Sequence, residues 1–294
     1  MSTLGNVSGY CNTNSSMSKE KALLVRHQEV FSIITNSNTT FQLSKYNSTL
    51  AKFRELWWTQ GNIHPSAKWE EASLPCLLIS DVDWEKFTER TDFFNVHGSW
   101  EWINGNVYVY ELPLGPHETC VKGIERLINL KDPEMTVIGL GATRTRAGNM
   151  GKEADGSFMP NFKPNVNSNG REGPDSHLPW PNLVIEVASL EREAHLLDAV
   201  KNYWLRPGRA HDAIAVKLVR SDTIISRIKV WHFCTDNRTL GELVPVTEFG
   251  FETLDDKQIL IQPQQFTINI KTECLFHGMP SDFLIPALIP NLLL

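Results

Sequence analysis

Long hydrophobic runs are missing from this chain. No segment approaches the roughly 20 consecutive apolar residues that a helix needs to cross a bilayer. The first 17 residues are rich in Ser, Asn and Thr and lack the apolar core of a secretory signal peptide. These absences predict an intracellular protein, cytoplasmic or nuclear, with no membrane partner.

Paired cysteines are also missing. The five cysteines are scattered, their number is odd, and none belongs to a Cys-x-x-Cys pair. Closely spaced pairs are the usual signature of a structural zinc site, and an even, regularly spaced set is that of a disulfide framework. The chain is therefore predicted to have neither. The five residues are Cys11, Cys76, Cys120, Cys234 and Cys274.

An excess of positive charge is absent as well. The formal net charge is −6 and the sequence pI is about 5.9. A protein that binds nucleic acid over its whole surface is usually basic. The composition argues against that class, whereas contact with nucleic acid through one local patch stays open.

Motifs of several enzyme classes do not occur. The segment Gly139, Leu140, Gly141 lacks the third glycine of a dinucleotide-binding fingerprint. There is no Walker sequence, no His-Glu-x-x-His zinc motif and no Gly-x-Ser-x-Gly nucleophile elbow. None of these activities is supported by the sequence.

The chain does contain enough apolar material for a folded core, with 41% hydrophobic and 10% aromatic residues among 294. Three parts are predicted. Residues 1–18 are expected to form a disordered tail, because they are polar and of low hydrophobicity. Residues 19–75 are expected to form a helical N-terminal extension, and residues 76–294 the main domain.

Patterns in the main domain predict a series of helices and strands. Two alternating runs flank Asn104 and Gly105, which is the strongest short-range signal for a β-hairpin. The segment 160–181 is rich in Pro, Asn and Gly and predicts a long loop. Helices are predicted over 84–89, 118–130 and 191–205, and strands over 136–145, 156–159, 183–188, 213–219 and 224–233. This order predicts a mixed α+β (α/β) domain with a central mixed sheet flanked by helices.

Glu186 is the most informative residue in the sequence. It lies in the run from Leu183 to Ala188, which is too apolar for an exposed strand. A buried carboxylate costs several kcal/mol unless it is paired, hydrogen-bonded or bound to a metal. A strand-end glutamate that reaches solvent and a structural salt bridge are the alternatives to a functional role.

Asp155 precedes the short apolar run 156–159. If that run pairs beside the strand of Glu186, the two carboxylates lie at neighbouring strand ends. An Asp-Gly pair is also a turn signal, and a simple turn is the alternative interpretation of Asp155.

Lys201 falls in the predicted helix 191–205. At about 100° per residue, with Leu197 set to zero, Lys201 lies near about +40° and Val200 near about −60°, so the lysine is at the edge of the apolar stripe. Its ammonium is expected to point toward the end of the Glu186 strand. A lysine that extends outward into solvent is the alternative.

Two carboxylates and one lysine make a coherent site for phosphodiester hydrolysis. Mg²⁺ takes oxygen ligands, keeps several waters, and is typically held by one or two carboxylates together with substrate phosphate. Such an ion polarises a phosphoryl oxygen and activates a water, while the lysine stabilises charge on the phosphate. The predicted cofactor is therefore Mg²⁺ or Mn²⁺.

The order of these residues resembles the restriction-endonuclease-like (PD-(D/E)XK) superfamily, and more specifically the Uma-type restriction endonuclease family, which is common in bacteria. The resemblance spans roughly residues 84–233 and is carried by Trp100–Gly105, His117, Asp155, Pro181–Ser189 and Lys201. It implies a restriction-endonuclease-like core. It also implies that Asp155, Glu186 and Lys201 are catalytic and that Asp155, Glu186 and Glu101 bind the metal.

Two positions depart from the family pattern. The residue before Asp155 is Ala154 rather than Pro, and the second residue after Glu186 is Ala188, so that the site depends on Lys201 alone. The segment 160–181 is also expanded. These departures leave open the alternative that the chain is an inactive descendant of this family.

Several nearby residues have a weaker signal. Glu101 is either a further metal ligand or an exposed hairpin glutamate, and His117 is expected to cap or pack at the start of its helix rather than to act as a base. Arg144, Arg146 and Lys152 are candidates for contact with substrate phosphate, against the default of basic side chains on a solvated strand end.

The leading hypothesis from the sequence is a divalent-metal-dependent nuclease that hydrolyses DNA in preference to RNA. One alternative is an inactive nuclease fold that serves as a binding or effector module. Another is an interaction protein in which the N-terminal extension matters more than the site. The sequence also leaves open whether the chain forms a homodimer and whether the N-terminal extension binds a protein partner.

Overall fold

The computed structural model describes residues 54–61, 74–94, 96, 100–112, 115–164, 172–174, 178–221, 224–252, 267–280 and 292–293. All of them belong to one compact unit, Phe53–Leu294. The predicted tail 1–18 and most of the predicted extension 19–75 lie outside the described residues, so their bounds stay predictions. No helix in the described part of the chain is long and apolar enough to cross a membrane.

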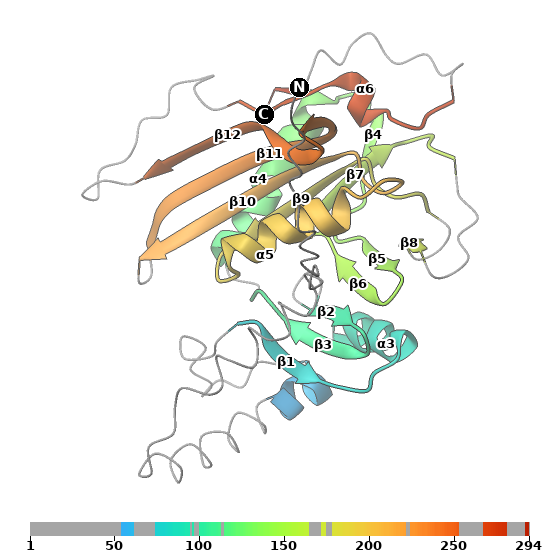
Figure 1. The fold of residues 1–294 in the computed structure, drawn as a ribbon, viewed down its shortest axis with the longest axis vertical. Helices are drawn as coiled ribbons and strands as arrows, with labels where there is room; N and C mark the ends of the chain where they lie inside the picture. The colour runs from blue at the N-terminus through green and yellow to red at the C-terminus, as the bar shows by residue number, and fades with distance from the viewer. Residues whose placement is uncertain are drawn as a thin grey trace, which may run out of the picture. The chain divides into compact units, whose positions relative to one another are not determined.

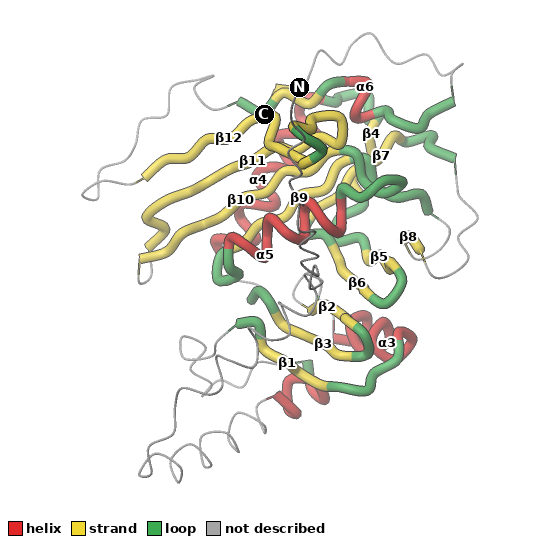
Figure 2. Tube along the Cα trace, in the orientation of Figure 1, coloured by secondary structure: helices red, strands yellow, loops and turns green. Residues whose placement is uncertain are grey.

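The main sheet, sheet B, has six strands in the order β12-β11-β10-β9-β7-β4 (Figures 1 and 2). Strands β9 and β10 run parallel, and their described neighbours pair antiparallel. The predicted mixed central sheet is therefore confirmed. The strands are β4 (Val137–Gly139), β7 (Gly156–Pro160), β9 (Leu183–Ala188), β10 (Asp212–Ser221), β11 (Ile224–Thr239) and β12 (Glu242–Glu252).

Helices cover both faces of sheet B, as predicted. Helix α4 (Gly115–Lys131) packs its Val121 and Ile128 in the same cluster as Ile185 of β9. On the other face, α5 (Glu193–Asp198) continues into a π-helical stretch, η2 (Ala199–Trp204), which packs against Val184. Figure 1 shows α5 in front of the strands and α4 behind them. Side chains alternate along a strand, so Glu186 faces α5 and η2, as Val184 does.

A second sheet, sheet A, has the order β1-β3-β2-β6-β5-β8, and its pairs are antiparallel. The predicted hairpin is confirmed, because Asn104 and Gly105 both have positive φ values, 50° and 80°, as a tight hairpin turn requires. Helix α3 (Trp84–Phe94) packs against this sheet. The strands are β1 (Cys76–Ile79), β2 (Trp100–Ile103), β3 (Asn106–Val109), β5 (Arg144–Ala147), β6 (Met150–Glu153) and β8 (Glu172–Pro174).

The second sheet differs from the single sheet that the sequence predicts. The predicted strand 136–145 is in fact two strands, β4 in sheet B and β5 in sheet A. The extended backbone is interrupted between them at Gly141, whose φ of +62° is unfavourable for other residues. A small third sheet pairs β13 (Asn269–Ile270) with β14 (Leu292–Leu293), and helix α6 (Thr272–Leu275) follows β13.

Gly151 supplies a test of how sheet A packs. It lies opposite Trp102, and a Cβ at this position would lie 1.9 Å from the ring of the buried Trp84. We expect Gly151→Ala to lower the free energy of unfolding by about 1–3 kcal/mol, because the ring has to move. Urea titration of the purified chain measures this change.

The matched control is Gly123→Ala in α4, where an added Cβ meets nothing within 4 Å. This variant is expected to gain about 0.4–1 kcal/mol, since alanine restricts the unfolded chain. If both substitutions change the free energy of unfolding by the same amount, Gly151 does not lie against Trp84 in the way described.

Candidate active site

Glu186 lies in the middle of β9 and is only 4% exposed. The indole Nε1 of Trp204 donates a hydrogen bond to Glu186 Oε1 at 2.5 Å, and Oε2 lies 3.8 Å from Lys152 Nζ. Burial raises the pKa of Glu186 well above its usual value. Lys152 opposes this shift, while the carboxylates of Asp155, Glu191 and Glu101 add to it. A buried carboxyl surrounded by others in this way is typical of a functional site.

Lys152 provides the positive charge beside Glu186. It projects from β6, and its Nζ donates a short hydrogen bond to Glu101 Oε1 on β2. Both side chains are buried. Desolvation opposes the charged form of Lys152, but Glu101, Glu186 and Glu191 together raise its pKa well above the usual value. Lys152 is therefore an ammonium at neutral pH, held between two carboxylates.

Asp155 lies in the link between β6 and β7, beside β9. Its Oδ2 accepts a hydrogen bond from the backbone N–H of Val187 at 2.7 Å and lies 3.2 Å from His117 Nε2. Burial lowers the pKa of His117, but the contact with Asp155 and the charge of Glu111 raise it to about 9 overall. The structure thus brings Asp155 next to the strand of Glu186 and pairs it with an imidazolium.

His195 extends the cluster on the α5 side. Its Nδ1 makes a short hydrogen bond with Glu191, and its Nε2 lies 3.6 Å from Glu101 Oε2. The imidazole stacks on Tyr110 with ring centroids 3.7 Å apart and planes at 7°. Sequence reasoning missed His195, Glu191 and Tyr110. The i, i+4 spacing of Glu191 and His195 is the one signal that could have indicated their contact.

Glu111 fixes the segment that follows β9. Its carboxylate accepts hydrogen bonds from the backbone N–H groups of Ser189, Leu190 and Glu191 at 2.5 to 3.2 Å. Lys217 Nζ donates to the carbonyl oxygens of Ser189 and Glu191 at 2.7 and 2.5 Å. The turn from β9 into α5 is therefore held from both sides, which fixes the position of Glu191. Sequence reasoning did not find Glu111, because its partners are backbone groups far along the chain.

Lys201 takes a different position from the one expected. Its Nζ lies 5.1 Å from the ring centroid of Phe233, and among the described residues no contact joins it to Glu186 or Asp155. The physical reason is the reference direction: Leu197 is only half-buried, whereas Leu196, Val200 and Tyr203 are buried, so the face toward sheet B is centred away from Lys201. Trp204, which is fully buried, is the residue of η2 that reaches Glu186.

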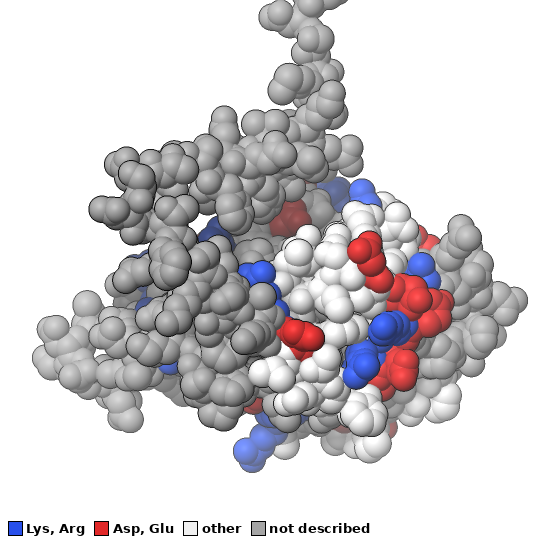
Figure 3. Space-filling model, turned by 90° about the horizontal axis from the view of Figure 1, so that it is seen from below, with Lys and Arg blue, Asp and Glu red and all other residues white. Residues whose placement is uncertain are grey.

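The two arginines proposed to contact phosphate are engaged with the protein itself. Arg144 is buried and donates hydrogen bonds to Glu153 and Asp92 at 2.7 and 2.6 Å. The guanidinium of Arg146 lies between 5.3 and 5.4 Å from the ring centroids of Trp102 and Trp84. Both positions fit a role in holding sheet A together. On the face drawn in Figure 3, the acidic and basic side chains that the structure describes lie next to one another, beside a largely uncharged area.

No family model and no curated protein matches this chain. Among solved structures, the chain is similar to the crystal structure of a DUF820 protein from Anabaena variabilis ATCC 29413 that is described as a candidate nuclease. The sequence identity is 14%, the match covers 56% of this chain and 82% of the other, and the TM-score is 0.37.

Proposed function

We propose that this protein is a divalent-metal-dependent nuclease that hydrolyses phosphodiester bonds, in DNA in preference to RNA. The observation that carries the proposal is the buried Glu186, with Asp155 on the neighbouring chain segment and the ammonium of Lys152 beside it. This is the set of groups expected in a phosphodiesterase site of the restriction-endonuclease-like kind. It differs from the sequence-based prediction in that Lys152 takes the role assigned to Lys201.

The donor set fits a hard divalent cation such as Mg²⁺ or Mn²⁺. Asp155 and Glu186 both offer carboxylate oxygens. The charge of Asp155 raises the pKa of Glu186, and a bound cation would lower that pKa again. A bound cation would polarise a phosphoryl oxygen and lower the pKa of a water. Two carboxylates are sufficient, because Mg²⁺ completes its shell with waters and substrate phosphate.

The remaining residues have supporting roles in this proposal. Trp204 orients the Glu186 carboxylate through its indole N–H, and Glu101 holds Lys152 in place. Lys152 then stabilises negative charge on the phosphate that is attacked. Glu101, which the sequence offered as a third metal ligand, has its oxygens directed at Lys152 and His195. We therefore propose it as the residue that positions Lys152.

An inactive nuclease fold that serves as a binding module is the second candidate. One observation favours it: Lys152 is only 6% exposed and is bound to Glu101, so substrate phosphate has to compete with a buried carboxylate for this lysine.

Nucleic-acid cleavage by the full chain separates the two candidates. Double-stranded DNA, single-stranded DNA and RNA are incubated with the wild-type protein in Mg²⁺, in Mn²⁺ and in EDTA. We expect DNA cleavage with either metal, slower cleavage of RNA, and none in EDTA. A folded chain that cleaves no nucleic acid with either metal would leave the binding module as the better account.

A further inference from the structure

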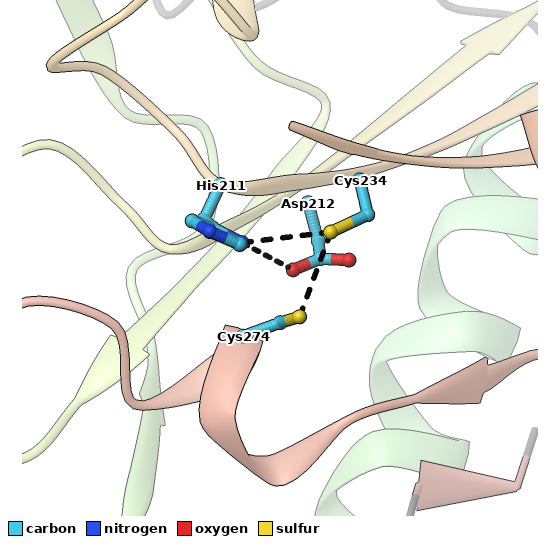
Figure 4. Close-up of side chains that lie close together, drawn as sticks. All are labelled: His211, Asp212, Cys234 and Cys274. Carbon is cyan, nitrogen blue, oxygen red and sulfur yellow. Dashed lines mark hydrogen bonds and ion pairs between the residues drawn. The ribbon is translucent and has the colours of Figure 1, made fainter. Parts of the chain in front are cut away.

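A second cluster of ligand-type side chains lies away from the proposed active site. It consists of His211, Asp212, Cys234 and Cys274, all of them buried. One ligand atom from each lies within 4.8 Å of those of the other three. Figure 4 shows the four side chains converging from the start of β10, from β11 and from α6.

The sheet and the helix explain why these residues meet. Asp212 and Cys234 are direct partners across the antiparallel pair β10 and β11. Helix α6 presents Cys274 to the same place, and its Sγ lies 3.5 Å from Cys234 Sγ. The backbone N–H groups of His211 and Asp212 both donate to the carbonyl of Asn182, which fixes the start of β10.

Three of the six distances between the ligand atoms fit a tetrahedral metal, and all six are within 4.8 Å. With Zn–S of about 2.3 Å, Zn–N of about 2.05 Å and Zn–O of about 2.1 Å, a regular tetrahedron has edges of about 3.8 Å for S–S, about 3.6 Å for S–N and about 3.4 Å for N–O. The corresponding distances here are 3.5 Å for Cys234 to Cys274, 3.8 Å for Cys234 to His211 Nδ1, and 3.1 Å for His211 Nδ1 to Asp212 Oδ2. Each differs from the ideal edge by about 0.3 Å or less.

A surrounding shell of polar groups supports the ligands. Asp212 Oδ1, the oxygen that faces away from His211, makes a hydrogen bond with His232 Nε2 at 2.7 Å. His211 Nε2 lies 3.7 Å from Asp236 Oδ1. Carboxylates that orient a ligating histidine, and hydrogen bonds that orient a ligating carboxylate, are typical of metal sites.

We propose that His211, Asp212, Cys234 and Cys274 form a structural zinc site. Four protein ligands and near-complete burial leave no open position for a substrate, which is the arrangement of structural rather than catalytic zinc. Zn²⁺ replaces the two thiol protons, because the thiolate is the form that binds metal. The ion fastens α6 to the adjoining ends of β10 and β11. Thiolate ligands distinguish it from the Mg²⁺ or Mn²⁺ proposed at Glu186.

Sequence spacing could not indicate this site. Cys234 and Cys274 are 40 residues apart, and neither belongs to a short pair with the other ligands. The prediction against a structural zinc site rested on that spacing. In the structure, the pairing of β10 with β11 and the position of α6 bring the four side chains together. A disulfide between the same two cysteines is the competing outcome, because their sulfur atoms are already close.

Metal content and Co²⁺ spectroscopy test the proposal on the full chain. We expect about one zinc per chain after purification, and a sulfur-to-metal charge-transfer band when Co²⁺ replaces zinc. Cys274→Ser and His211→Gln should each lower zinc affinity at least about 10-fold. The matched control is Cys76→Ser, a buried cysteine on β1 that should leave zinc content unchanged.

Two results would overturn the proposal. One is a wild-type chain that binds neither Zn²⁺ nor Co²⁺ after reduction. The other is a metal-free chain whose mass is lower by two hydrogen atoms, which indicates a Cys234–Cys274 disulfide. If Cys274→Ser does not fold, the wild-type chain still decides, because zinc should protect Cys234 and Cys274 from alkylation, and a chelator should expose them.

Discussion

Lys152→Met is expected to cause the largest loss of stability among the single substitutions considered for this site. The lysine is buried between Glu101 and Glu186, and methionine keeps most of its unbranched length while removing the charge. Removing one partner of a buried ion pair costs about 3–5 kcal/mol, because the carboxylates that remain are left uncompensated. Urea unfolding at pH 7 without metal measures this effect, and DNA cleavage should be lost in parallel.

Lys201→Met is the matched control for Lys152→Met. Its ammonium lies over the ring of Phe233, a contact worth about 0.5–1 kcal/mol. We expect a small loss of stability and little change in cleavage. The reverse pattern, with Lys201→Met inactive and Lys152→Met active and stable, would restore the catalytic lysine that the sequence predicts.

A double variant tests the charge balance at the same place. In Lys152→Met/Glu101→Gln, part of the stability lost in Lys152→Met should return, because one of the unpaired charges is removed.

Glu186→Gln is expected to lower the rate of DNA cleavage at least about 100-fold while the fold persists. Glutamine has nearly the same shape and keeps an oxygen that accepts the hydrogen bond from Trp204. It cannot carry the negative charge that a divalent cation needs. Since burial and neighbouring carboxylates raise the pKa of Glu186, and Glu101 still neutralises Lys152, loss of the Glu186 charge should not destabilise the metal-free chain.

The control for this substitution is Glu248→Gln, at an exposed position of β12 in the same sheet. Cleavage and thermal midpoint should both stay at wild-type values. If Glu186→Gln cleaved DNA as fast as Glu248→Gln, the proposed site would be ruled out even though the protein is a nuclease.

Much of the fold was predictable, because burial leaves a direct mark on the sequence. The continuous apolar run 183–188 predicts a strand covered on both faces, and β9 is the strand that α4 covers on one face and α5 on the other. The Asn104-Gly105 pair likewise predicts a hairpin from local turn geometry alone. The second sheet was not predictable in this way, because its strand β5 has a polar sequence, Arg144–Ala147, and its pairing with β6 leaves no hydrophobic pattern.

The site was predictable only in part. Glu186 stands out because an acidic residue inside a buried strand needs a partner, and Asp155 follows from its place before the next strand. The ammonium was assigned to Lys201 because Leu197 was taken as the centre of the buried face, whereas the structure centres that face on Leu196, Val200 and Tyr203. Lys152 lies in a short strand with no periodicity of its own. Its proximity to Glu101 arises from the pairing of β2 with β6, and its proximity to Glu186 from the short link to β7, which pairs with β9; local patterns show neither.

Calorimetric titration with Mn²⁺ tests the central claim most directly. Zinc-loaded wild type and zinc-loaded Glu186→Gln are measured in parallel with Cys274→Ser, which lacks one proposed zinc ligand. The account predicts one Mn²⁺ site in the wild type, loss of that site in Glu186→Gln, and its retention in Cys274→Ser. Equal Mn²⁺ binding by wild type and Glu186→Gln would contradict it.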